Sequence, residues 1–172
     1  MTEKLGESQK MNSAEMLQKL KQGSVQERTE AAEALARIGT DAAFAVTELA
    51  EACGDQPAVS EWAIAALEEL GPPPTSALSA LAELTGSNNT LTTYWAITLL
   101  GRAGPEAVSH QEILADMLET SDDMSLKQKA AWSLGRIHAD SARAMTALKQ
   151  AALSGNARLS RLSRQSLQQS QT

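Results

Sequence analysis

Apolar residues recur along most of the chain with the period of an amphipathic helix. Two consecutive segments place their apolar residues at the spacing i, i+3, i+4, i+7: Ala31, Ala34, Leu35 and Ile38, and then Val46, Leu49, Ala50 and Cys53. Short polar links, such as GDQP, GSNN and SDDM, separate segments of this kind. The pattern therefore predicts helices joined in hairpins, with each helix burying one face.

The same pattern returns at a fixed interval. The segments AAEALARIGTDAAFAVTEL (31–49) and AAWSLGRIHADSARAMTAL (130–148) are identical at ten of nineteen aligned positions. Intermediate copies place a leucine in the same register, at spacings of 32, 33, 34 and 33 residues: Leu35, Leu67, Leu100, Leu134 and Leu167. Such a period predicts an all-α fold, a right-handed α-solenoid of about five helical hairpins.

Start and stop signals divide the chain into ten expected helices. The expected hairpins are 13–22 with 25–38, 41–53 with 58–70, 75–85 with 91–103, 106–119 with 125–137, and 141–153 with 157–169. Gly39, Gly71 and Gly104 are expected to be left-handed caps at the ends of second helices, and Pro72 or Pro105 prevents continuation of two of them. We expect one domain over residues 11–169, with flexible ends at 1–10 and 170–172.

Composition and charge narrow the possible functions. Aromatic residues make up only 3% of the chain, so Ala, Leu, Ile, Val and Met must build the core. The net charge of -6 argues against nucleic acid as the main partner, because gripping phosphates requires a basic face. A single cysteine excludes an internal disulfide framework, and no apolar run is long enough to cross a membrane. We expect a cytoplasmic monomer that does not bind membranes.

The run LKQKAAWSLGRI at 126–137 resembles the second helix of a HEAT repeat. It is most similar to the short bacterial and archaeal form called the phycobilisome-lyase HEAT-like repeat. That form opens its second helix with Val-Arg, where Leu126-Lys127 stands here, and Arg28 keeps the arginine in the first copy. Departures are Glu27 in place of the apolar opener and His138 in place of a glycine. The resemblance implies an armadillo-like scaffold and is not specific for one activity.

In such solenoids the second helices line the concave surface, and the family's variable columns there hold all three tryptophans and the only tyrosine of this chain: Trp62, Tyr94, Trp95 and Trp132. The column of Trp132 holds Glu33, Ala65, Thr98 and Gln165 in the other copies, so the fold does not require a large side chain there. We expect Trp95 and Trp132 to be largely exposed anchors for a partner. For Trp62, exposure and packing at the seam between hairpins both remain open.

Charges in the same columns change sign along the chain. The early copies are acidic at Glu30, Glu33, Glu61 and Glu69, whereas the later copies are basic at Arg102, Lys129, Arg136 and Arg161. A groove with this gradient and central aromatic residues suits a protein or peptide whose acidic segment lies on the later repeats. The leading hypothesis is a non-enzymatic adaptor. Its expected binding residues are Trp62, Tyr94, Trp95, Arg102, Lys129, Trp132, Arg136 and Arg161.

Two other functions stay open as alternatives. The resemblance implies that related proteins hold a tetrapyrrole, and Arg102 and Arg136 beside the tryptophans could bind its propionates, with or without lyase activity. A HEAT-like DNA-binding or glycosylase function is a remote alternative, because half of the groove is acidic. We find no catalytic triad, no zinc-ligand spacing around His110 and His138, and no Gly-rich phosphate loop. No cofactor is therefore expected.

Overall fold

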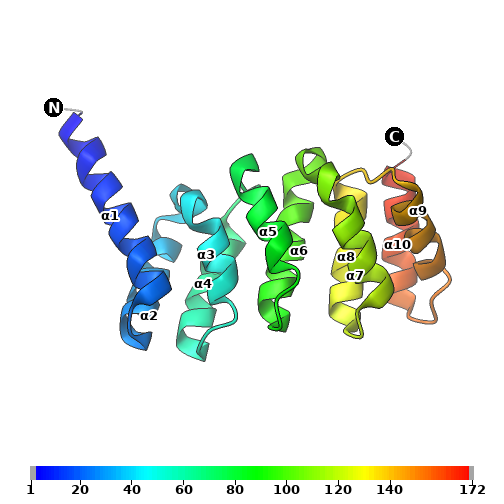
Figure 1. Ribbon diagram of the computed structural model, residues 1–172, viewed down its shortest axis with the longest axis horizontal. Helices are drawn as coiled ribbons and strands as arrows, with labels where there is room; N and C mark the ends of the chain where they lie inside the picture. Colours follow the sequence, from blue (N-terminus) through cyan, green and yellow to red (C-terminus); the bar gives the residue numbers. More distant parts are fainter. Residues whose placement is uncertain (1–2, 171–172) are drawn as a thin grey trace. The chain divides into compact units, whose positions relative to one another are not determined.

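The computed structural model describes residues 3–170, with side chains described from Ser13 onward, and these residues form helices and no β-strand (Figure 1). The chain divides into two compact units, residues 1–71 and 72–172, and the boundary falls at the start of the proline run 72–74. None of the described helices is long and apolar enough to cross a membrane. The prediction of one domain over 11–169 stays a prediction.

Unit 1 consists of two helical hairpins. Helices α1 (Glu3–Gln22) and α2 (Val25–Arg37) form the first, and the 3₁₀ helix η1 (Gly39–Ala45), α3 (Val46–Ala52) and α4 (Pro57–Glu69) form the second. Helix α2 packs against both α1 and α4. The backbone of α1 is helical from residue 3, so the helix starts ten residues before the expected 13–22; residues 1–2 lie outside the described part.

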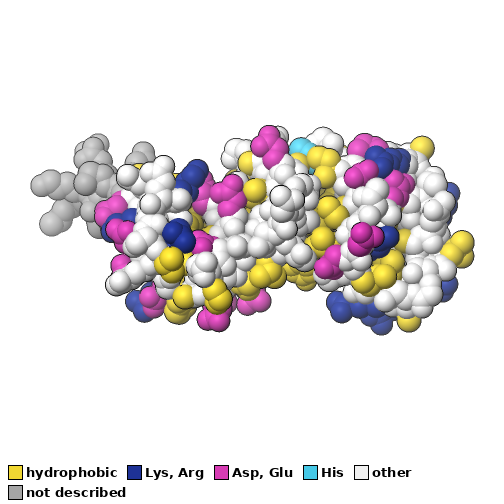
Figure 2. Space-filling view, turned by 60° about the horizontal axis from the view of Figure 1, so that its bottom comes forward, with side chains coloured by type: hydrophobic (Ala, Val, Ile, Leu, Met, Phe, Trp, Pro, Cys, Tyr) yellow, Lys and Arg dark blue, Asp and Glu magenta, His cyan; other side chains and the backbone are white. Residues whose placement is uncertain are grey.

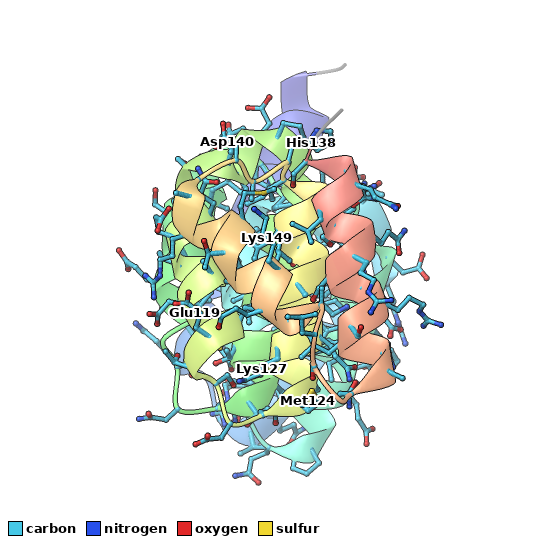
Figure 3. All side chains as sticks on the ribbon, turned by 90° about the vertical axis from the view of Figure 1, so that its right-hand side faces the viewer. Glu119, Met124, Lys127, His138, Asp140 and Lys149 are labelled. Carbon is cyan, nitrogen blue, oxygen red and sulfur yellow. The ribbon has the colours of Figure 1, made fainter. Side chains whose placement is uncertain are left out.

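Unit 2 repeats the same plan. Its hairpins are η2 (Thr75–Ala77) and α5 (Leu78–Leu84) with α6 (Thr90–Ala103), η3 (Gly104–His110) and α7 (Gln111–Thr120) with α8 (Met124–Arg136), and α9 (Ala142–Ala151) with α10 (Ala157–Gln169). The second helices α6, α8 and α10 pack side by side in this order. Viewed from the C-terminal end, α9 with Lys149 lies in front toward the left, and α10 lies on the right (Figure 3).

Local side-chain caps explain where most second helices begin. Ser24 forms a capping box with Glu27, in which Ser24 N donates to Glu27 Oε2 at 2.8 Å and Glu27 N donates to Ser24 Oγ at 3.3 Å. The side chains of Asn89, Asp123 and Asn156 accept backbone N–H groups at the starts of α6, α8 and α10. Asp123 of the SDDM link thus fixes the start of α8.

The first helices begin differently from the prediction. Three of them open as 3₁₀ turns, η1, η2 and η3, and only then continue as α-helix. A 3₁₀ turn places residues i and i+3 on one face, so its apolar pattern over a single turn is the same as that of an α-helix. The sequence pattern therefore could not separate the two.

Left-handed backbone positions end three second helices. Gly39 (φ 58°) and Gly104 (φ 64°) were predicted, and His138 (φ 55°) takes the same role where the repeat lacks glycine. The prediction is wrong for Gly71, which has no positive φ. Leu70 ends α4 in an extended conformation (φ -72°, ψ 137°), and the proline run after Gly71 favours a chain that stays extended.

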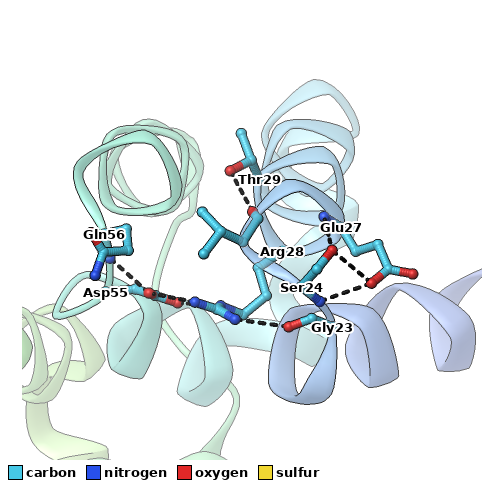
Figure 4. A network of polar contacts seen from close by, with 8 residues as sticks. Gly23, Ser24, Glu27, Arg28, Thr29, Asp55 and Gln56 are labelled. Atoms are coloured by element: carbon cyan, nitrogen blue, oxygen red, sulfur yellow. Dashed lines mark hydrogen bonds and ion pairs between the residues drawn. The ribbon is translucent and has the colours of Figure 1, made fainter.

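One repeated hydrogen bond fastens each second helix to the segment before it. The side chain seven residues before each anchor leucine donates to a backbone carbonyl at the end of the preceding first helix or link. The donors and acceptors are Arg28 to Gly23 (2.7 Å), Ser60 to Cys53 (2.8 Å), Thr93 to Ser87 (3.1 Å), Lys127 to Glu119 (3.2 Å) and Ser160 to Ala152 (2.7 Å). Arg28 also makes a bidentate ion pair with Asp55, at 2.5 and 2.8 Å (Figure 4).

The core follows the anchor leucines. Leu35, Leu67, Leu100 and Leu134 are fully buried, whereas Leu167 is half-buried, because no further hairpin covers α10 within the described chain. Cys53 is fully buried as expected, and burial raises the pKa of its thiol to about 12. The thiol is therefore protonated at neutral pH and is unsuited to nucleophilic chemistry.

Candidate functional site

The candidate site lies on the second helices of unit 2, and glycines set how closely these helices approach. A Cβ atom at Gly101 of α6 would lie 2.6 Å from Ser133 Oγ and 2.6 Å from Trp132 Cζ3 of α8. Ser133 Oγ donates a hydrogen bond to the Ile97 carbonyl at 2.8 Å. Without a Cβ at Gly101, α8 can therefore lie against the backbone of α6.

A glycine that faces a serine also joins α8 to α10. A Cβ atom at Gly135 would lie 2.5 Å from Ser166 Oγ, and Ser166 Oγ donates to the Ala131 carbonyl at 2.7 Å. Gly101 and Gly135 each follow an anchor leucine, and Ser133 and Ser166 each precede one. This repeated close contact holds α6, α8 and α10 side by side and fixes the side chains on their shared face.

A hollow of about 300 Å³ opens on that face, and we call it the α8 hollow. Helix α8 supplies its middle, while α6 and α10 supply one wall each. Its lining residues are Tyr94, Ser125, Gln128, Lys129, Trp132, Arg158 and Leu162. The hollow therefore combines two aromatic rings and a leucine with two cationic side chains.

Lys129 occupies the centre of this arrangement. Its Nζ lies 4.8 Å from the ring centroid of Tyr94 and 4.8 Å from that of Trp132, so the ammonium group contacts two aromatic faces. Tyr94 in turn meets Trp95 edge to face, with ring centroids 6.2 Å apart. These contacts restrict the rotamers of Lys129 and direct its charge toward the hollow.

The expectation for Trp95 is wrong, because its side chain is only 7% exposed. The Arg102 guanidinium carbon lies 5.4 Å from the Trp95 ring centroid, and Tyr94 covers another side of the ring. Trp95 therefore packs beneath the surface and positions Tyr94 and Arg102. Trp132 is half-buried, so the expectation of large exposure holds only in part, since its ring also lies against Gly101.

The remaining predicted residues lie in different places. Tyr94, Lys129 and Trp132 meet in the α8 hollow, whereas Arg136 and Arg161 are exposed on α8 and α10 and do not line it. Trp62 belongs to α4 of unit 1, where its side chain is 37% exposed. The partner-binding role of these residues stays a prediction.

Sequence reasoning missed four residues of the α8 hollow: Ser125, Gln128, Arg158 and Leu162. Gln128 and Leu162 stand in the variable columns, so the column pattern contained the signal. Ser125 and Arg158 come earlier in their helices and occupy the same repeat position, nine residues before Leu134 and Leu167. Comparing that column across copies could have found them.

Charge is distributed unevenly between the two units. Residues 1–71 contain thirteen acidic and six basic residues, whereas residues 72–172 contain eight acidic and nine basic residues. Within unit 2 the second helices hold no acidic residue, and seven cations lie on them: Arg102, Lys127, Lys129, Arg136, Arg158, Arg161 and Arg164. In Figure 2, Lys and Arg side chains gather along the lower edge of unit 2.

Ion pairing differs in the same way. Each cation of unit 1 from residue 13 onward pairs with a carboxylate: Lys19 with Glu15, Lys21 with Glu48, Arg28 with Asp55, and Arg37 with Glu33. In unit 2, Arg143 of α9 pairs with Asp116 and Glu119. Among the described residues, no carboxylate pairs with Lys129, Arg136, Arg158 or Arg161. Their charges are therefore available to an external anion.

The site has the chemistry of a binding surface. Over the part of the chain with described side chains, no group of three or more His, Cys, Asp or Glu residues could hold a metal ion. The α8 hollow contains no carboxylate, histidine or cysteine that could serve as a general base or nucleophile beside a substrate. Its cations and rings can bind an anion and an apolar group together.

Neither a protein-family model nor a curated protein matches the sequence. Solved structures do. The structure resembles the crystal structure of an engineered protein, Northeast Structural Genomics Consortium target OR329, with a TM-score of 0.61 and 20% identity over 92% of this chain and 78% of that one. A second engineered protein, target OR497, matches with a TM-score of 0.63 and 20% identity over 91% of this chain. This chain covers 47% of the length of that second protein. At this level of identity the likeness shows the all-helical fold alone.

Proposed function

We propose that this chain is a non-enzymatic scaffold that binds a protein or peptide carrying an acidic segment on the second helices of unit 2. The observation that carries the proposal is the set of seven cations on α6, α8 and α10, with no acidic residue on these helices. Charges of one sign on adjacent helices attract a partner of the opposite sign and orient it during encounter.

The repeat architecture supports this proposal. We infer that the hairpins of both units continue one HEAT-like solenoid of five hairpins, because the anchor leucines and the fastening hydrogen bonds recur at the same interval in every copy. Repeat proteins of this kind use the exposed face of one helix set as an extended binding surface.

A tetrapyrrole ligand has less support. The α8 hollow, at about 300 Å³, is at the lower end of the range for small-molecule pockets, and much of its wall is polar or charged. Arg102 contacts Trp95, which is buried, so this pair does not form the open apolar pocket that a tetrapyrrole needs. Absorbance after incubation with a bilin remains the experiment that separates the two functions.

Charge reversal tests the proposed function. We expect Arg136→Glu and Arg161→Glu each to weaken binding of a Glu-rich peptide by about tenfold or more and to reduce its salt dependence. Lys149→Glu is the matched control, because Lys149 is also exposed in unit 2 but lies on the first helix α9 (Figure 3). Fluorescence anisotropy with the peptide measures all three variants. Equal losses in the control and the two face variants would contradict the proposal.

A further inference from the structure

The α8 hollow differs from the rest of the basic face because it places apolar walls next to oriented cations. Tyr94, Trp132 and Leu162 provide the apolar walls, while Lys129 and Arg158 provide the charges. The exposed cations Arg136 and Arg161 do not line the hollow. A ligand group that enters the hollow must therefore satisfy both kinds of wall.

The size of the hollow limits what enters it. A volume of about 300 Å³ accommodates one or two side chains but not a whole peptide helix. The rest of a bound segment must then lie over the surrounding face, where the other cations of α8 and α10 are. The hollow is thus suited to binding one or two side chains of a longer acidic segment.

The Lys129 side chain is already held in place before an anion binds. Two rings hold the Lys129 ammonium at 4.8 Å each, so little side-chain entropy is lost when an anion binds. Arg158 is one of three arginines on α10, a helix without acidic residues. The structure thus offers one ammonium and one guanidinium group to the same anion.

The charged donors of the hollow are its two cationic side chains, Lys129 and Arg158. The hydroxyl of Ser125 already donates to Asp123 Oδ1, and the amide of Gln128 donates to Asn156 Oδ1 at 3.2 Å. The hydroxyl of Tyr94 and the indole N–H of Trp132 can add neutral donors. A carboxylate can accept from both cations with its two oxygens, and a phosphate can do the same with additional charge, so the experiment includes both.

We propose that the α8 hollow binds an Asp or Glu side chain of a peptide together with the large apolar side chain next to it. The carboxylate lies between Lys129 and Arg158, and the apolar side chain packs on Trp132 and Leu162. This inference rests on the proposed function, because it names the element that the basic face recognises. It makes sequence context, and not negative charge alone, the basis of selectivity.

The test uses the full chain and four short, labelled, Ala- and Gln-based peptides. They carry Leu-Glu, Leu-Gln, Ala-Glu or Leu-phosphoserine pairs and are otherwise identical. We expect the Leu-Glu peptide to bind most tightly, and loss of either member of the pair to weaken binding by about tenfold, the scale of one charge-assisted hydrogen bond or one buried leucine. Anisotropy measures each dissociation constant.

Two variants localise the effect to the hollow. In Arg158→Gln, exchange of Glu for Gln in the peptide should change binding by clearly less than the roughly tenfold of the wild type, because one of the two charge partners is gone. In Leu162→Ala, exchange of Leu for Ala in the peptide should likewise matter less. Arg161→Gln, on the same helix but outside the hollow, should keep both preferences, although overall binding weakens slightly.

Three results would overturn the proposal in different ways. Tighter binding of the phosphoserine peptide would assign the hollow to phosphate. Persistence of the full Glu preference in Arg158→Gln would place recognition elsewhere on the basic face and would leave the proposed function intact. Absence of binding by every acidic peptide would overturn the proposed function together with this inference.

Discussion

The second helices of the two units have the same leucines at their buried repeat positions, but they carry different charges at their exposed positions. Leu35 and Leu67 in unit 1 and Leu100 and Leu134 in unit 2 are equally buried. Helices α2 and α4 nevertheless carry six glutamates, whereas α6, α8 and α10 carry only cations. Since one core pattern tolerates both signs of charge, folding does not explain the basic face. We propose that the difference reflects the binding of a partner by unit 2.

Packing between second helices also differs between the units. In unit 1 the corresponding positions hold Ala36 of α2 and Ala66 of α4, so a Cβ atom is present in both. In unit 2 the corresponding contacts pair Gly101 with Ser133 and Gly135 with Ser166, each with a hydrogen bond across the helices. In unit 2 the glycines thus leave room for Ser133 and Ser166 to reach the backbone of the preceding helix, on the side where Tyr94, Trp132 and Leu162 line the hollow.

The largest expected effect breaks this close approach. We expect Gly101→Ala to lower the free energy of unfolding by about 1–3 kcal/mol, because the new Cβ would overlap Ser133 and Trp132. Ala36→Gly at the same column of unit 1 should lose about 1 kcal/mol for a different reason, the lower helix propensity of glycine. Urea unfolding measures both variants. If Gly101→Ala raised the midpoint, propensity would outweigh packing, and the account of unit 2 would be contradicted.

Smaller effects on stability are expected for two buried serines of α10, one without a hydrogen bond and one with a hydrogen bond to α8. Ser163 is fully buried in a column that otherwise holds alanine, and its hydroxyl has no hydrogen-bond partner among the described residues. Ser163→Ala should therefore stabilise the protein by about 1–2 kcal/mol, because a buried unsatisfied hydroxyl is removed. Ser166→Ala should destabilise it by about 1 kcal/mol, through loss of the hydrogen bond to the Ala131 carbonyl. If both variants changed the stability in the same direction, this explanation would be contradicted.

Second helices could be predicted from the sequence to within one residue at each end because their signals are local. Asn89, Asp123 and Asn156 cap the starts, and glycine or its replacement His138 marks several ends. The 3₁₀ openings of the first helices could not be predicted, since both helix types share the apolar spacing over one turn. Gly71 was mispredicted because the proline run keeps the chain extended there.

The site could be predicted only in part. The column pattern correctly brought Tyr94, Lys129 and Trp132 together, because those positions share one helix face. The column does not fix burial, as Trp62 is 37% exposed and Trp95 is 7% exposed at the same repeat position. The Trp95 ring meets Tyr94 edge to face and lies under the Arg102 guanidinium, and periodicity carries no information on such contacts.

The smallest expected effect concerns the acid sensitivity of one contact in unit 1, the hydrogen bond between Arg28 and Asp55. In unit 1 the hydrogen bond from Arg28 holds the pKa of the Asp55 carboxyl below its usual value. Its stabilising contribution is therefore present above the unfolded pKa of about 4 and is lost as pH falls through the lower folded value. Corresponding fastening positions in unit 2, Thr93 and Ser160, use hydroxyl groups that do not titrate in this range.

We expect Asp55→Asn to lower stability at neutral pH and to have little effect at a pH below the folded pKa of Asp55. Because the Asp55 side chain is partly exposed, the change at neutral pH should be modest. Urea unfolding of the wild type and the variant across the acid range checks the convergence of the two curves. A difference that stays constant with pH would assign the effect to packing and not to the ion pair.

The central claim is that the second helices of unit 2 bind an acidic segment and that those of unit 1 do not. The most direct test follows the indole N–H signals of the three tryptophans by NMR while a Glu-rich peptide is added. Trp132 lines the α8 hollow, whereas Trp62 lies on α4 of unit 1. The account predicts a saturable shift of the Trp132 signal with little change at Trp62. A shift at Trp62 with an unchanged Trp132 signal would contradict it.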